Sequence, residues 1–241
     1  MERNINSLLN YNIQATDGVI GEVKEFYFND KTWHIRYLII KTGGWMFGRE
    51  VLISPVALIK EKWQNDVFPV NLTKKQISSS PDIDTDKPVA RPREIELYDH
   101  YQWESYWGSG FYGGGSLGVS MPFPVIDRKV QIEADKNDKR VDDDNHLRST
   151  AIITGYHIQA TDGEIGHVND FIMDDKTWEI KFIVVDTHNW FGGKKVIIPV
   201  GLIKKIEWTD SKVFLDMSMN AVKKCKLFAE ADFIHLQLAK Q

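Results

Sequence analysis

Seven histidines and one cysteine are the residues of this chain that could most directly bind a metal or attack a substrate. None of the histidines lies at the short spacing from a second histidine or cysteine that a zinc site uses. They are His34, His100, His146, His157, His167, His188 and His235. Cys225 has lysines close by in the sequence, and neighbouring cations lower the pKa of a thiol. We nevertheless expect surface histidines and an incidental thiol, because no acid–base partner accompanies them.

Three further patterns resemble ligand-binding motifs in part. Asp82, Asp84 and Asp86 imitate the start of a calcium loop, but Lys87 and Arg93 stand where that loop needs glycine and glutamate. The acidic run 142–144 is typical of a solvated linker. The glycine run 113–115 has no GK[ST] after it, so it is no phosphate loop. The sequence therefore predicts no catalytic residue, no metal and no cofactor, and we expect that the protein is not an enzyme.

Two stretches of the chain are copies of each other, and they must supply the elements that position any site. Residues 13–53 match residues 158–198 at a constant offset of 145 (158 − 13), with about half of the positions identical. A repeat of this kind indicates two similar structural units. We expect a first barrel at 1–78, a linker at 79–150 and a second barrel at 151–241.

Each copy has the pattern of short strands separated by turns. Segments rich in β-branched and aromatic residues predict the strands. They lie at 19–28, 34–41, 49–53, 58–63 and 67–72, and in the second copy at 165–173, 179–186, 194–198, 202–208 and 213–217. Short, evenly spaced strands indicate a small closed β-barrel. The predicted fold is all-β, with two barrels of about six strands each in tandem, joined by a long irregular linker.

The repeated Asp-Gly pairs could be mistaken for catalytic acids. No His, Ser or Cys recurs beside them at matched positions, and a general acid needs such a partner. Asp-Gly is a preferred hairpin turn, because glycine adopts a positive φ at little cost. We therefore assign structural turns to Asp17, Gly18, Gly21, Asp162, Gly163 and Gly166.

Helical signals are few. Thr73 is placed to cap a short helix over 73–77, and residues 218–225 are its counterpart in the second copy. The segment after Cys225 could pack on the second barrel as a helix or as a strand, and the sequence does not decide between them.

Aromatic residues are the main candidates for a partner interface. Those in the third loop of each copy would either plug a barrel end or face a partner. Those in the linker would either pack back onto a barrel or bind something outside. The candidates are Trp45, Phe47, Trp190, Phe191, Tyr98, Tyr101, Trp103, Tyr106 and Trp107.

Charge and hydropathy narrow the class of protein. The net charge of −4 argues against nucleic-acid binding, which needs a basic face. The N-terminal segment has no apolar core of signal-peptide length, and no run reaches the length of a membrane span. A cytoplasmic protein is expected.

The repeated motif resembles the PRC-barrel domain. It appears as TDGVIGEV, NDKTWHIRYLII and VLISPVALI, and again as TDGEIGHV, DDKTWEIKFIVV and VIIPVGLI. The segment REIELYDHYQWESYW is similar to the connector of bacterial proteins with tandem PRC-barrels. The family includes the cytoplasmic domain of the photosynthetic reaction-centre H subunit and the C-terminal domain of a ribosome maturation factor. In both, the resemblance implies a docking module.

Three functions follow as hypotheses. The first is a non-catalytic scaffold that binds a protein partner or a second copy of the chain. The second, implied by the resemblance, is an accessory role at a photosynthetic electron-transfer complex, with peripheral membrane association. The third is a ligand-binding protein or enzyme that uses the cleft between the barrels and the linker.

Overall fold

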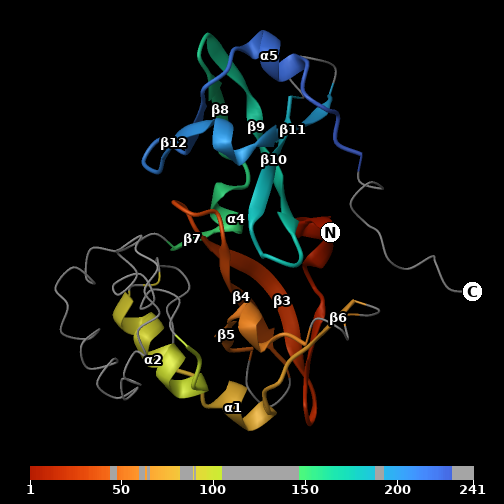
Figure 1. Ribbon diagram of the computed structural model, residues 1–241, viewed down its shortest axis with the longest axis vertical. Helices are drawn as coiled ribbons and strands as arrows, with labels where there is room; N and C mark the ends of the chain where they lie inside the picture. The colour runs from red at the N-terminus through yellow and green to blue at the C-terminus, as the bar shows by residue number, and fades with distance from the viewer. Residues whose placement is uncertain are drawn as a thin grey trace, which may run out of the picture.

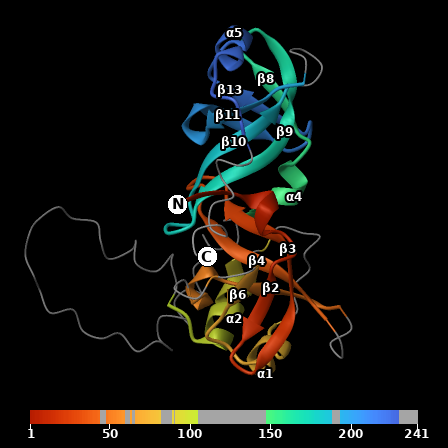
Figure 2. The ribbon, with the colours of Figure 1, turned by 90° about the vertical axis from the view of Figure 1, so that its right-hand side faces the viewer.

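The structure is a computed structural model, and it describes residues 1–43, 48–59, 63, 66–81, 89, 91–104, 147–187 and 193–229. It is a mostly β protein with two sheets, one above the other along the long axis of the molecule (Figure 1). Short helices α1 and α5 close the two far ends (Figures 1 and 2). The two sheets follow the two sequence repeats.

The first sheet has the strand order β5-β4-β3-β2-β6, and β7 pairs with β3 off this path. Its strands are β2 (Asn12–Ala15), β3 (Gly18–Asn29), β4 (Ile35–Thr42), β5 (Glu50–Ile53), β6 (Val67–Pro69) and β7 (Leu147–Ser149). Its helices are η1 (Ile5–Leu8), η3 (Pro55–Ala57), α1 (Lys74–Ser78), α2 (Arg91–Tyr101) and α4 (Thr150–Ile153). Leu58 adds an isolated bridge to Val70, and residues 60–62 of the predicted fourth strand lie outside the described residues.

The second sheet has the order β11-β10-β9-β8-β13-β12, and β1 pairs with β9 off this path. Its strands are β1 (Glu2–Asn4), β8 (His157–Ala160), β9 (Gly163–Asp174), β10 (Ile180–Asp186), β11 (Lys195–Pro199), β12 (Ile203–Glu207) and β13 (Lys212–Leu215). Helices η7 (Val200–Leu202) and α5 (Met219–Lys223) complete it. The strands predicted in this copy are confirmed.

The predicted closure of the barrels is wrong for the described strands. Each sheet is an open path that ends at β5 and β6, or at β11 and β12. The far half of the long strands β3 and β9 is paired with β7 and β1 rather than with a strand that would close the ring. Along the edge of β11 the chain returns, with Ile197 N–H donating to Lys226 O at 2.9 Å and Phe228 N–H to Lys195 O at 2.9 Å. The segment after Cys225 is therefore extended as far as it is described.

The Asp-Gly turns tie each first hairpin to a helix. Asp17 Oδ1 accepts a hydrogen bond from Lys74 N–H at 2.8 Å, and Asp162 Oδ1 accepts from Met219 N–H at 2.7 Å. Thr73 caps α1, as predicted, and it also forms a capping box with Gln76. These aspartates anchor backbone, which explains their recurrence without chemistry.

Gly166 is needed because β9 crosses β10 closely. Its φ is +118°, and a methyl group in place of its hydrogen would lie 2.1 Å from the carbonyl oxygen of Asp186. The equivalent Gly21 would meet Lys41 O at 2.3 Å. The assignment of these two glycines to turns is therefore wrong: they lie inside β3 and β9, where the close approach of the neighbouring strand excludes any side chain.

The predicted irregular linker contains a helix, which is a correction. Residues 91–101 form α2, and α2 lies beside the first sheet (Figure 1). Ile95, Leu97, Tyr98 and Tyr101 of this helix are buried. Residues 105–146, which include Tyr106 and Trp107, lie outside the described residues.

Candidate functional site

The two repeats exchange short strands at the middle of the molecule (Figures 1 and 2). Strand β1 from the start of the first repeat pairs with β9 of the second, with Asn4 opposite Ile172. Strand β7, which lies 145 residues further on, pairs with β3 of the first repeat, with Ser149 opposite Tyr27. Each sheet therefore takes one strand from the other repeat, and two sheet edges are covered in the same step.

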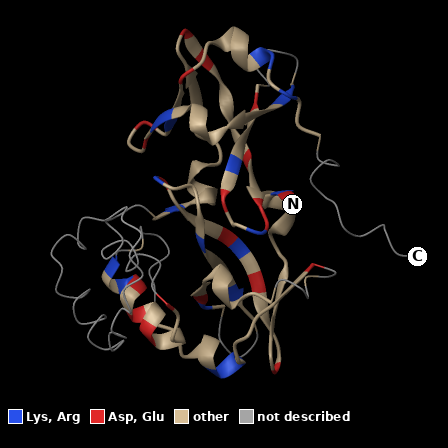
Figure 3. Ribbon diagram, in the orientation of Figure 1, with Lys and Arg blue, Asp and Glu red and all other residues tan. Residues whose placement is uncertain are grey.

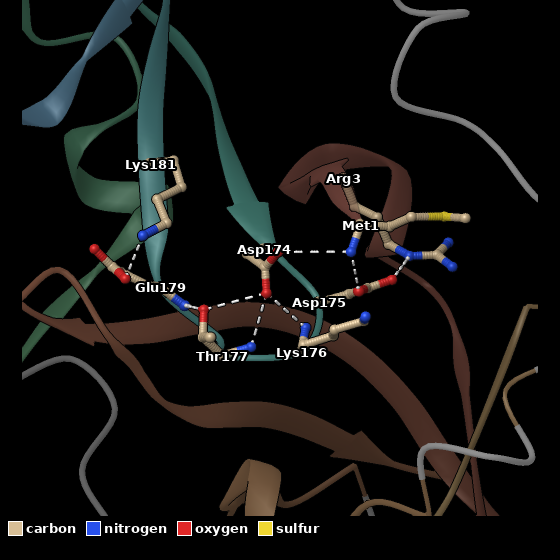
Figure 4. A network of polar contacts seen from close by, with 8 residues as sticks. All are labelled: Met1, Arg3, Asp174, Asp175, Lys176, Thr177, Glu179 and Lys181. Atoms are coloured by element: carbon tan, nitrogen blue, oxygen red, sulfur yellow. Dashed lines mark hydrogen bonds and ion pairs between the residues drawn. The ribbon is translucent and has the colours of Figure 1, made fainter.

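Two arginines on the exchanged strands link the repeats reciprocally. Arg3 Nε lies 2.8 Å from Asp175 Oδ2, and Arg148 Nε lies 3.1 Å from Asp30 Oδ2 (Figure 4 shows the first pair). Arg3 also lies over the ring of Trp63 at 5.8 Å, and Arg148 over that of Trp208 at 4.2 Å. Each guanidinium thus contacts an aspartate of one repeat and a tryptophan of the other.

The tips of the β3–β4 and β9–β10 hairpins meet across the junction. Ile35 N–H donates to Trp178 O at 2.8 Å, and Ile180 N–H donates to Trp33 O at 2.7 Å. His34 and Glu179 form an isolated bridge between these two bonds. Both tryptophans have a positive φ, 58° at Trp33 and 61° at Trp178.

Polar side chains hold each tip in this shape. Asn29 Oδ1 accepts from the backbone N–H groups of Lys31 and Thr32, and Asp174 Oδ1 does the same for Lys176 and Thr177 (Figure 4). Burial alone would raise the pKa of Asp174, but these backbone hydrogen bonds lower the pKa overall. The tips are therefore preorganised for the contact across the junction.

Trp178 of the second repeat completes the core of the first. Its side chain is 4% exposed and lies among Trp63, Phe26 and Phe68, with ring centroids 5.5, 6.4 and 6.4 Å away. The equivalent Trp33 is only partly buried and stacks on Phe28 of its own repeat at 5.2 Å. The exchange is therefore reciprocal in the backbone but not in the packing of the two indoles.

Two buried carboxylates have structural partners. Asp170 accepts from Asn4 Nδ2 at 3.0 Å and from the N–H groups of Asn6 and Phe171 at 3.1 and 2.7 Å. Burial raises the pKa of Asp170, and these hydrogen bonds oppose the shift. This carboxylate therefore fixes the N-terminal segment on the second sheet.

Glu94, 1% exposed, fixes α2 on the first sheet. Its carboxylate lies 2.7 Å from Arg91 Nη1, and the Tyr37 hydroxyl donates to it at 2.7 Å. The second repeat has Phe182 where the first has Tyr37, and Pro199 where the first has Ser54, which hydrogen-bonds Tyr98. The second sheet therefore lacks the polar groups that hold α2, which explains why the helix packs on the first.

The predicted interface aromatics divide into three groups. Tyr98 and Tyr101 are each 5% exposed, and burial raises the pKa of both to about 12. They pack on the first sheet. These two linker aromatics therefore pack back onto a domain of the chain and do not face an outside partner. Trp103 is half-buried and stacks on Tyr101 at 4.3 Å. The others, Trp45, Phe47, Trp190, Phe191, Tyr106 and Trp107, lie outside the described residues and stay predictions.

A cavity of about 300 Å³ lies where α2, the first sheet and the tip of the second repeat meet. Its walls come from the start of β4, from η3, from Tyr98 and Glu104, and from the β9–β10 turn. This is the position that the sequence predicts for a cleft between the repeats and the linker.

The described histidines are dispersed, and the structure brings together no group of three metal-ligating side chains within its described ranges. His146, His188 and His235, like the aspartates at 82–86 and 142–144 and the glycines at 113–115, lie outside those ranges. Cys225 is partly buried, and burial raises the pKa of its thiol rather than lowering it. The lysines beside it do not activate the thiol.

The sequence did not reveal the exchanged strands. Three-residue strands carry no usable periodicity, but Arg3 and Arg148 share the offset of 145, as do Trp63 and Trp208. These matched pairs, together with the matched Asp30 and Asp175, were the sequence signal that could have revealed the exchange.

Comparison with known proteins agrees with the duplicated plan. The family model described as PRC-barrel domain matches residues 1–77 and 153–216. The matched ranges cover both repeats and leave the segment between them unmatched. No curated protein matches the chain.

Proposed function

The chain belongs to the PRC-barrel family, and we propose that it is a non-catalytic protein–protein interaction module in which two such domains act as one scaffold. The proposal rests on the reciprocal strand exchange. A module that presents two similar domains in a fixed relation can hold a partner against both at once. The exchanged strands and the paired arginines supply that fixed relation.

The use of the buried charges supports a non-catalytic role. Buried titratable groups with perturbed pKa values are the usual candidates for acid–base chemistry. Here Asp170 binds backbone and amide donors, and Glu94 binds Arg91 and Tyr37. A group that holds two elements together in this way cannot also change protonation during turnover without loosening the fold.

The partner is a protein of another kind or a second copy of the chain. Charges of both signs are interspersed along the molecule (Figure 3), which does not favour a polyanion as partner. No helix in the described part of the chain is long and apolar enough to cross a membrane. The accessory role at a photosynthetic complex and the cytoplasmic location stay predictions.

The experiment separates the two domains without removing either. Arg3→Ala combined with Arg148→Ala removes both ion pairs and both stacking contacts at the junction. The control is Lys205→Ala, which removes an exposed ion pair with Glu207 within one strand. Wild type, double variant and control are each used as bait for cross-linking with mass spectrometry, and their masses are measured by sedimentation.

We expect wild type and control to cross-link one partner, or a second copy, through both domains. The double variant should lose that complex while keeping its strand content by circular dichroism. A substrate whose turnover is abolished by one side-chain substitution would contradict the proposal. So would a partner that binds the double variant as tightly as wild type.

A further inference from the structure

We propose that the junction between the repeats is also an interface for a second copy of this chain, in which the first repeat of each copy pairs with the second repeat of the other. Such a dimer keeps every contact of the junction and changes only which copy supplies each side. The inference names the partner of the scaffold, and for that role it rests on the proposed function. It is carried by the exchanged strands and by the two hairpin tips.

The strand contacts across the junction follow a two-fold pattern. Asn4 lies opposite Ile172 in one exchanged pair, and Ser149 lies opposite Tyr27 in the other. Asn4 and Ser149 are equivalent positions of the two repeats, as are Tyr27 and Ile172, at the constant offset of 145. An interface with this reciprocal pattern is isologous, which is the kind that joins two copies in a symmetric dimer.

The hairpin tips continue the same pattern. The bond from Ile35 N–H to Trp178 O is the equivalent of the bond from Ile180 N–H to Trp33 O. Between these two bonds, the isolated bridge joins two residues that also occupy equivalent positions. All of these contacts are noncovalent, so a second copy can supply either side of them.

The side chains favour the pairing of unlike repeats over that of like repeats. In a pair of second repeats, Glu179 of each copy would lie opposite the other, and like charges directly opposite each other destabilise paired strands. In a pair of first repeats, the aromatic core that holds Trp178 would have to receive Trp33, which instead stacks on Phe28 of its own repeat. Exchange between two copies therefore gives a closed dimer with two junctions, each of a first and a second repeat.

The connection between the repeats does not decide which copy supplies β7. Helix α2 and strand β7 both lie on the first sheet, and 42 residues separate Glu104 from Leu147 (146 − 104 = 42). A chain of that length spans at most about 150 Å. It favours pairing within one copy by an effective concentration of at most about 1 mM, so wild type should exchange with a Kd of about 1 mM or below.

The test reverses one charge at the junction in each of two full-length chains. One chain carries Arg148→Asp and the other Asp30→Arg, so in each chain alone this contact joins two like charges. In a dimer formed by exchange between the two chains, one junction has the original ion pair and the other has the same pair reversed. The chains are unfolded in urea, mixed one to one and refolded. Sedimentation then gives the mass of the mixture and of each chain refolded alone.

Two controls accompany the mixture. Lys205→Glu mixed with Glu207→Lys reverses an exposed ion pair within β12, where exchange between copies cannot bring the new charges together. Arg148→Asp also removes the contact of Arg148 with Trp208, so a single chain with both Arg148→Asp and Asp30→Arg checks folding. This chain has the reversed pair within one copy, and it should be monomeric and unfold at higher urea than either single variant.

We expect the mixture to form a one-to-one dimer, while each variant alone and the β12 mixture stay monomeric at about 50 μM. Exchange relieves two like-charge contacts, each about tenfold in the equilibrium constant, so the Kd should fall about a hundredfold, to about 10 μM or below. The inference is overturned if the mixture stays monomeric at 100 μM, roughly ten times that Kd, although the doubly substituted chain folds. It is also overturned if each variant alone dimerises as tightly as the mixture, because the contact then lies on another face. If the mixture stays monomeric while wild type still cross-links a different protein through both domains, this inference fails and the scaffold proposal stands.

Discussion

Replacing Trp178 by alanine should destabilise the first sheet, although Trp178 belongs to the second repeat. Its indole is 4% exposed and lies among Phe26, Trp63 and Phe68, all from the first repeat. Removing it leaves a cavity that the surrounding rings fill only in part. Trp33→Ala, at the equivalent position, is the matched comparison, because Trp33 is partly buried against its own repeat.

The expected cost follows from the difference in burial. Truncating a fully buried tryptophan to alanine lowers the free energy of unfolding by about 3–5 kcal/mol. The half-buried indole of Trp33 covers less apolar surface, and its stacking on Phe28 adds little, so about 1–2 kcal/mol is expected there. Domain stabilities are typically about 5–15 kcal/mol, so the Trp178→Ala protein should still fold.

Two measurements test this prediction. Urea unfolding gives the change in free energy, and hydrogen exchange with mass spectrometry locates it. Trp178→Ala should speed amide exchange in β2, β3 and β4, more than 130 positions away in sequence (178 − 42 = 136). If the faster exchange were confined to β9 and β10, Trp178 would not complete the first core. Equal costs for the two substitutions would refute the packing argument as well.

Three further predictions follow from single contacts. Tyr37→Phe reproduces the side chain of the second repeat and removes the hydroxyl that donates to the buried carboxylate of Glu94. It should lower the free energy of unfolding, measured with urea, by about 1–3 kcal/mol and speed amide hydrogen exchange in α2. Gly166→Ala places a methyl group against a backbone carbonyl and should cost at least about 2 kcal/mol, whereas Gly201→Ala, where a methyl group meets nothing within 4 Å, should change the melting temperature very little. Burial raises the pKa of Asp170 above 3.8, so the stability that this group contributes falls as pH rises from 3.8 through the raised pKa. Asp170→Asn should therefore gain stability relative to wild type between pH 3.8 and 7, and a constant difference across that range would be inconsistent with a buried charge.

The sequence predicts those parts of the fold that depend on local pattern. The repeated apolar alternation gives the strands, and Asp17-Gly18 and Thr73 mark a hairpin and a helix start that the structure confirms. Hydrogen-bonded strands and caps are specified within a few residues, so one copy of the pattern suffices. The second copy only strengthens the assignment.

The parts that the sequence does not predict depend on contacts between distant segments. A barrel closes only if the curvature of the whole sheet brings its two edge strands together. The described sheets stay open. Helix α2 buries Arg91 and Glu94 as a pair, so its inner face does not have the apolar pattern of an ordinary amphipathic helix. The linker therefore looks irregular in sequence.

The candidate sites divide in the same way. Asp17 and Asp162 lie in the turns for which they were assigned, and Gly18 and Gly163 begin the strands that follow. Gly21 and Gly166, expected in turns, lie inside β3 and β9. Tyr98 and Tyr101, which could have bound a partner, are buried residues of α2. The cavity needs residues from β4, α2 and the β9–β10 turn together. No spacing in the sequence brings His34 and Lys176 to one place.

The central claim is that strand exchange fixes the two domains in one rigid body. It is tested most directly by the distance between spin labels, one on each domain, measured by double electron–electron resonance. The labels are placed at Val56→Cys, 63% exposed, and at the equivalent Gly201→Cys, where a Cβ meets nothing within 4 Å, in a Cys225→Ser background. The account predicts one narrow distance distribution, which broadens when the junction arginines Arg3 and Arg148 are replaced by alanine. A broad or multiple distribution in the protein with both arginines intact would contradict it.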